Sequence, residues 1–201
     1  MAERFDSARE LAGRARRIYE ELDWADKISA NYAAVAADIE VLAGDYPEAE
    51  RLLSASCAKL EAWGEQARLA TQAAQLGEAL YWQGRFEEAL RWSQVAEGCA
   101  ATDDASAQFF WRSLRAKALA RRGAFSEAHA LAREAVEIGA ATDALSQHAQ
   151  VLLAFAEVLS LEGQGQEAAE AIEGAIRLLE KKGNIAASRR ARSSLGELAR
   201  A

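Results

Sequence analysis

The sequence predicts an all-α fold in which about ten helices form a right-handed α-solenoid of helical hairpins. The 201 residues include a single proline, whereas proteins usually contain about 5%. About a quarter of the chain is alanine, the residue with the highest helix propensity. A motif of glycine, an aromatic residue and alanine recurs every 39 or 40 residues. Together these observations predict helices in pairs, joined by short turns.

The motif reads Gly-x-[Phe/Tyr]-x-x-Ala and has four copies, at 44–49, 84–89, 123–128 and 163–168. The fourth copy carries Gly165 in place of the aromatic residue. Glycine favours the left-handed conformation that ends a helix, so each copy predicts the end of one helix and the start of the next. Pro47 then falls in the first turn of a second helix, where its missing N–H costs nothing.

The predicted elements follow from this register in chain order. A helix over 3–21 carries only the second half of the motif, from Phe5 to Ala8, and has no partner before it. The first helices of the hairpins are expected over 26–43, 65–83, 104–122 and 143–162. The second helices are expected over 47–62, 87–98, 126–139 and 166–182. A closing amphipathic helix over 185–199 would cap the open end of the stack.

Small residues recur at three positions of the register. Those in the motif itself are Ala8, Ala49, Ala89, Ala128 and Ala168. Those seven residues later are Ala15, Ser56, Ala96, Ala135 and Ala175. Those twelve residues before the motif alanine are Ala37, Gly77, Ala116 and Ala156. Positions seven apart share one helix face, so small side chains there let neighbouring helices approach closely.

Stacked hairpins share a continuous core, and no linker interrupts the pattern, so one domain over 1–201 is expected. Its units are a half repeat at 1–22, hairpins at 24–63, 64–102, 103–141 and 142–183, and a capping helix at 184–201.

This register resembles the tetratricopeptide repeat family over nearly the whole chain. Its period of about 40 exceeds the usual 34 and is similar to the longer variety in the C-terminal regions of large bacterial signalling and transcriptional regulators. The resemblance implies a module that binds other proteins. The bulky aromatic residue common early in the first helix of such repeats is replaced here by Ala33, Ala73, Arg112 and Leu152.

Composition argues against several functions. The net charge of −7 disfavours direct nucleic-acid binding, and the longest nearly apolar run, 151–161, is too short to span a membrane. Cys57, Cys99, His129 and His148 show no metal-ligand or nucleophile pattern, and Asp103 and Asp104 stand at a predicted helix start. We therefore expect no catalytic residue, cofactor or metal. Without an export signal, the chain is expected in the cytoplasm.

The concave face of such a stack is lined by first helices. The residues expected to bind a partner there are Asn31, Asp38, Thr71, Glu78, Tyr81, Phe110, Lys117, Gln150 and Glu157. Three of these are acidic and share one register position with Lys117, which favours a basic or mixed-charge peptide. Tyr81 and Phe110 are the best candidates for exposed aromatic contacts. The Lys/Arg/Asn clamp of family members that capture C-terminal carboxylates is not matched, because its positions hold Ala34, Asp38, Gln75, Phe110 and Leu114.

The leading hypothesis is therefore a non-enzymatic interaction module of a bacterial regulator that binds a peptide or helix. A second hypothesis is a self-association scaffold, because the apolar residues Phe5, Leu11 and Ile18 of the unpaired first helix need cover. A third is a sensor of signal peptides or small ligands.

Overall fold

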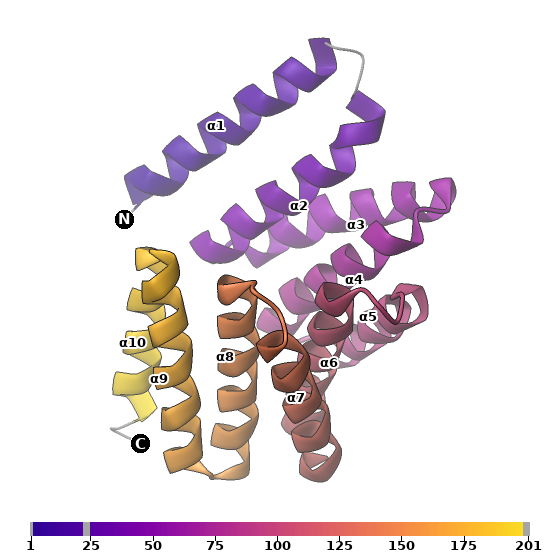
Figure 1. Cartoon of the computed structure of the whole chain (residues 1–201). Coiled ribbons are helices and arrows are strands. Elements are labelled where there is room, and N and C mark those ends of the chain that lie inside the picture. The colour runs from indigo at the N-terminus through magenta and orange to yellow at the C-terminus, as the bar shows by residue number, and fades with distance from the viewer. Residues whose placement is uncertain (1, 22–24, 199–201) are drawn as a thin grey trace. The chain divides into compact units, whose positions relative to one another are not determined.

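The structure, a computed structural model, describes residues 2–21 and 25–198, and within them it contains ten α-helices and no strand (Figure 1). The helices are α1 (Ala2–Glu21), α2 (Ala25–Ala43), α3 (Tyr46–Trp63), α4 (Gln66–Trp82), α5 (Phe86–Cys99), α6 (Ala105–Arg121), α7 (Phe125–Ala140), α8 (Leu145–Glu162), α9 (Gly165–Lys182) and α10 (Ile185–Leu198). The all-α prediction is confirmed, and the described helix ends lie within two residues of their predicted positions. Residue 199, the predicted end of the closing helix, lies outside the described residues.

The chain divides into two compact units, Met1–Ala100 and Ala101–Ala201, at a boundary within two residues of the one expected between the second and third hairpins. The expectation of a single domain over 1–201 therefore stays a prediction, and each unit is described by itself.

Unit 1 consists of α1 followed by the hairpins α2–α3 and α4–α5, with successive helices packed on one another. Arg9 on α1 makes a two-pronged ion pair with the buried carboxylate of Glu40 on α2, with Nε to Oε1 at 2.9 Å. Arg85, in the turn between α4 and α5, lies 2.7 Å from Glu50 on α3 and 2.6 Å from Glu88 on α5. The ion pairs thus join α1 to the first hairpin and the first hairpin to the second.

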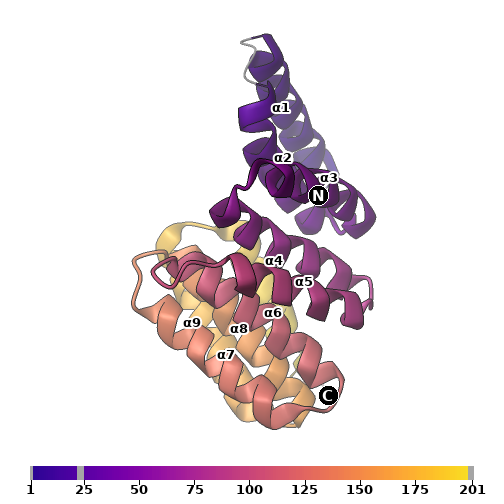
Figure 2. The same cartoon turned by 90° about the vertical axis from the view of Figure 1, so that its right-hand side faces the viewer.

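Unit 2 contains the hairpins α6–α7 and α8–α9 (Figure 2), and α10 packs on α9 (Figure 1). Phe109, Ala135 and Val151 form one buried cluster, and Leu159 and Ile172 belong to a larger one around α8 and α9. Ion pairs connect helices here too: Arg112 with Glu134, Arg121 with Glu157 and Arg192 with Glu180. His129 Nδ1 also lies 3.1 Å from the Glu162 carboxylate.

The helix ends follow the predicted chemistry. The four motif glycines all have positive φ, as at Gly84 with 76°, a conformation that L residues with a β-carbon rarely adopt. Asp45 caps α3 by accepting a hydrogen bond from the Glu48 backbone, with Pro47 in the first turn. Asp104 caps α6 by accepting from the Ala107 backbone at 3.0 Å, so this carboxylate serves a helix start.

From α2 onward, the small residues of the repeat are buried, as close packing of neighbouring helices requires. The motif alanines Ala49, Ala89, Ala128 and Ala168 are all fully buried. The positions seven residues later are buried as well: Ser56, Ala96, Ala135 and Ala175. On α1 the corresponding residues, Ala8 and Ala15, are only partly covered. The repeat packing is therefore complete in the four hairpins and incomplete at α1.

Candidate protein-binding surface

In unit 1, the predicted binding residues Asn31, Asp38, Thr71 and Glu78 lie on the neighbouring helices α2 and α4. Asn31 and Asp38 are exposed, and Thr71 and Glu78 are half-buried. The Gln75 side chain of α4 donates a hydrogen bond to Oδ1 of Asp38 at 3.1 Å, which connects the two helices at this face. The register therefore brings these polar side chains onto one pair of helices.

Of the predicted binding residues, Asp38 is the one best suited to bind a cationic side chain. Among the described residues it makes no ion pair, and its hydrogen-bond partner, Gln75, is a neutral amide. Desolvation by the surrounding protein raises the pKa of Asp38 above its ordinary 3.8, and the hydrogen bond from Gln75 lowers it by less. A carboxylate that is partly desolvated and lacks a cation gains from contact with a lysine or arginine side chain.

The aromatic part of this surface differs from the prediction. Tyr81 was expected to be exposed, but only 2% of it is accessible, so that expectation is wrong. Tyr81 packs against Phe86, with ring centroids 5.2 Å apart, and against the edge of Trp82. The half-buried motif aromatic Phe86, at the start of α5, therefore packs on the buried Tyr81 of α4.

Trp82 is the exposed aromatic residue at this end of α4, with 43% of its surface accessible. Its ring stacks on Tyr46 at 6.0 Å, and its Nε1 donates a hydrogen bond to Glu78 at 2.9 Å. Trp82 therefore presents a fixed ring beside the Glu78 carboxylate. The register position alone could not identify it, because Trp82 directly follows the expected residue.

In unit 2, Lys117 is more buried than a binding surface requires, whereas Phe110 lies at the edge of the core. Phe110 is half-buried and packs edge-on against Phe109 at 4.6 Å, beside the cluster that contains Val151. Lys117 is only 4% accessible, so the expectation that it lines an open face is wrong. Of the run 109–111, Phe110 is the residue at the edge of the core, since Phe109 and Trp111 are buried.

The other two expected residues of unit 2 lie on α8. Gln150 is exposed, whereas Glu157 is half-buried and forms a 2.8 Å ion pair with Arg121 of α6. Arg121 lies one helical turn beyond Lys117 on the same helix, but its register position gave no sign that it would pair with Glu157. The acidic register position is thus compensated by a cation at Glu157 but not at Asp38.

The remaining reactive residue types serve packing. Burial raises the pKa of the Cys57 thiol to about 12, and that of Cys99 is also raised by burial. His129 lies against Phe155 and Glu162, and burial lowers the pKa of His148. Within the described part of the chain, no three His, Cys, Asp or Glu residues come together as a metal site. None of its helices is long and apolar enough to cross a membrane.

Comparison with known proteins gives one family match and several similar folds. Residues 69–96, which cover most of α4 and α5, match the model of the tetratricopeptide repeat. No curated protein sequence matches the chain significantly. The crystal structure of BtubC (BKLC) from P. vanneervenii is similar, with 15% identity over 98% of this chain and 90% of that one, and a TM-score of 0.59.

Two further solved structures are similar at lower scores. YrrB, described as a TPR protein with an unusual peptide-binding site, has 20% identity over 86% of this chain and 80% of its own, with a TM-score of 0.48. The TPR2AB-domain:pHSP90 complex of yeast Sti1 has 16% identity over 100% and 99%, with a TM-score of 0.38. The chain is therefore an all-α protein of tetratricopeptide-like helical hairpins, with its sequence match to that family in the α4–α5 hairpin.

Proposed function

We propose that the chain is a non-enzymatic protein-interaction module that binds a basic or mixed-charge peptide or helix through the α2–α4 face of unit 1. The observation that carries the proposal is Asp38, an exposed carboxylate that has a raised pKa and no cationic partner among the described residues. Glu78 and the accessible ring of Trp82 lie on the adjacent helix and add a second carboxylate and a flat apolar contact. A lysine or arginine side chain combines well with both kinds of group.

The setting proposed for this module is a bacterial regulatory protein in the cytoplasm. The support is the repeat period of about 40, which is similar to the repeat regions of such regulators. In unit 2, Gln150 of α8 stays a separate predicted contact residue, and Glu157 is already neutralised by Arg121.

Titration calorimetry with a short amidated Lys-Ala-Ala repeat peptide tests the proposal. The wild-type chain should bind this peptide and should not bind the same peptide with glutamate in place of lysine. Asp38→Asn should weaken binding by about tenfold, because one charge-assisted contact is lost. The matched control is Asp143→Asn, which removes the same charge from an exposed position of unit 2 and should change affinity by less than about twofold. Equal effects of the two variants would overturn the proposal.

A second candidate function, self-association, is favoured by the uncovered face of α1. Leu11 and Ile18 lie seven residues apart on that helix and are 63% and 52% accessible. Light scattering over a wide concentration range should show a dimer that the double variant Leu11→Gln/Ile18→Gln dissociates. The control is Ile185→Gln, which changes an equally exposed apolar residue on α10. A wild-type chain that is monomeric throughout would exclude this function.

A further inference from the structure

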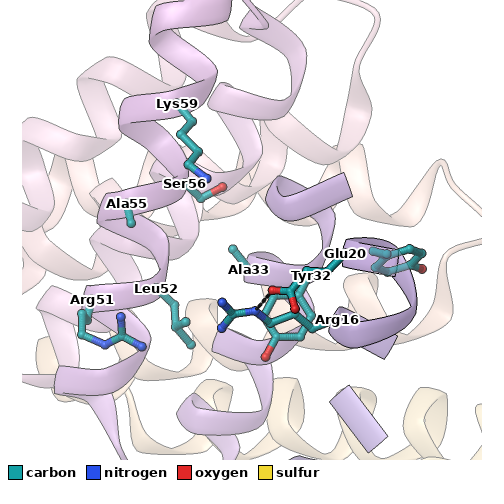
Figure 3. Close-up of a pocket in the computed structure, with 10 residues that line it drawn as sticks. Arg16, Glu20, Tyr32, Ala33, Arg51, Leu52, Ala55, Ser56 and Lys59 are labelled. Carbon is teal, nitrogen blue, oxygen red and sulfur yellow. Dashed lines mark hydrogen bonds and ion pairs between the residues drawn. The ribbon is translucent and has the colours of Figure 1, made fainter. Parts of the chain in front are cut away.

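A pocket of about 240 Å³ lies in unit 1 among α1, α2 and α3, and neither Asp38 nor Glu78 lines it (Figure 3). Arg51, Leu52, Ala55, Ser56 and Lys59 follow one another along α3 on one side of it. Arg16 and Glu20 of α1 and Tyr32 and Ala33 of α2 lie on the other side. The pocket is smaller than those that hold drug-sized ligands, about 300–1,000 Å³, so it suits one small chemical group.

The pocket exists because two facing register positions are both small. Ala33 on the first helix and Ala55 on the second both line it. In unit 2, the residues equivalent to Ala33 are larger and extend toward the second helix of their hairpin. Arg112 Nε lies 2.9 Å from Glu134, and Leu152 Cδ1 lies 3.4 Å from where a β-carbon on Gly174 would be. The position that usually carries a bulky aromatic residue is therefore left open in the first hairpin.

The charges around the pocket are opposite in sign to those of the whole protein. Three cationic residues and one acidic residue line it, in a chain with a net charge of −7. Arg16 pairs with Glu20 at 2.7 Å on its own helix, and Arg51 makes a two-pronged pair with the half-buried Glu48 on its own helix. Each guanidinium group has five N–H donors, so both retain donors for an incoming anion beside these pairs. Lys59 forms no ion pair among the described residues.

One buried polar atom in the pocket also needs a partner. Ser56 is only 4% accessible, and its Oγ has no hydrogen-bond partner in the protein. A buried hydroxyl without a partner is costly, and such groups in native proteins usually have an explanation. Ala33, Leu52 and Ala55 offer apolar contact beside this hydroxyl, and Tyr32 contributes a phenol.

We propose that this pocket binds a carboxylate attached to a short apolar group, with Arg16, Arg51 and Lys59 holding the anion and Ser56 donating a hydrogen bond. The apolar group would rest on Ala33 and Ala55. This chemistry occurs both in a free organic acid and in the C-terminal residue of a peptide. The site is separate from the α2–α4 face, so it does not depend on the peptide-binding function proposed above.

The test is an NMR titration of the amides of residues 33, 55 and 56, with four probes. The probes are benzoate, inorganic phosphate, acetyl-alanyl-leucine with a free carboxylate, and the same dipeptide as its amide. Saturable shifts with benzoate, the free dipeptide acid or both support the proposal, and which of them binds identifies the source of the carboxylate. Shifts with phosphate alone, equal shifts with the dipeptide amide, or no saturable shift with either acid would overturn it.

Matched variants make the test specific. Arg51→Gln/Lys59→Gln should weaken binding about tenfold, since two charged donors are lost. The control, Arg14→Gln/Arg17→Gln, removes the same charge from exposed positions of α1 that do not line the pocket, and should change affinity less than about twofold. Ala33→Leu should abolish binding by filling the pocket, and circular dichroism checks that it folds. Equal weakening by the two charge variants would show a nonspecific electrostatic effect and contradict the proposal.

Discussion

The two units share one repeat but use its register positions differently. In unit 2, Arg112 and Leu152 reach the second helices of their hairpins, and Glu157 is paired with Arg121. In unit 1, the equivalent Ala33 leaves a pocket and Asp38 has no cationic partner among the described residues. The glycines and small residues set the helical frame in both units, whereas a few larger side chains decide whether a position is closed or available for binding.

Gly139 in unit 2 leaves no room for a larger residue, because a β-carbon there would lie 2.9 Å from Val151 Cγ2. Gly139→Ala should destabilise the protein by about 1–3 kcal/mol, because buried Val151 must move. Gly98 in unit 1 is the matched control, since a β-carbon there meets nothing within 4 Å. Gly98→Ala should stabilise by up to about 1 kcal/mol through helix propensity. Urea unfolding measures both, and equal effects would show that the two contacts do not differ.

In unit 1, the first helix, α1, is attached to α2 by an ion pair. Arg9 contacts Glu40 through two nitrogens, and strong hydrogen bonding to that carboxylate raises the pKa of Arg9. Arg9→Met leaves the buried Glu40 without this partner, so the α1 amides should exchange about tenfold faster. Arg17→Met, at an exposed position of the same helix, is the control. Unchanged exchange in Arg9→Met would show that apolar packing alone holds α1.

The smallest expected effect is the contribution of Asp38 to the pH dependence of folding stability. Because its folded-state pKa is raised by desolvation, ionised Asp38 slightly destabilises the fold at neutral pH, and this cost disappears as pH falls through the raised pKa. Asp38→Asn should therefore be as stable as wild type or up to about 0.5 kcal/mol more stable at pH 7, with the difference shrinking in acid. Thermal unfolding at several pH values measures it. If Asp38→Asn is clearly less stable than wild type at pH 7, the ionised carboxylate stabilises the fold and the prediction is wrong.

The helices and their order could be predicted because glycine conformation and small-residue spacing are local properties of the chain. The burial of Tyr81 could not, because the register gives a face of α4 but not the way Phe86 and Trp82 close over it. The sequence indicated that Ala33 replaces a bulky residue on the first helix of its hairpin. A pocket also requires a small residue at the facing position of the second helix. Only the structure identifies that residue as Ala55.

The central claim, that unit 1 offers the binding surface while unit 2 closes the same positions, has one direct test. Backbone amide shifts of the full chain should be followed during titration with the Lys-Ala-Ala peptide. The account predicts saturable shifts on α2 and α4, centred on Asp38 and Glu78, and small shifts on α6 and α8. Shifts centred on Lys117 and Glu157 instead would contradict it.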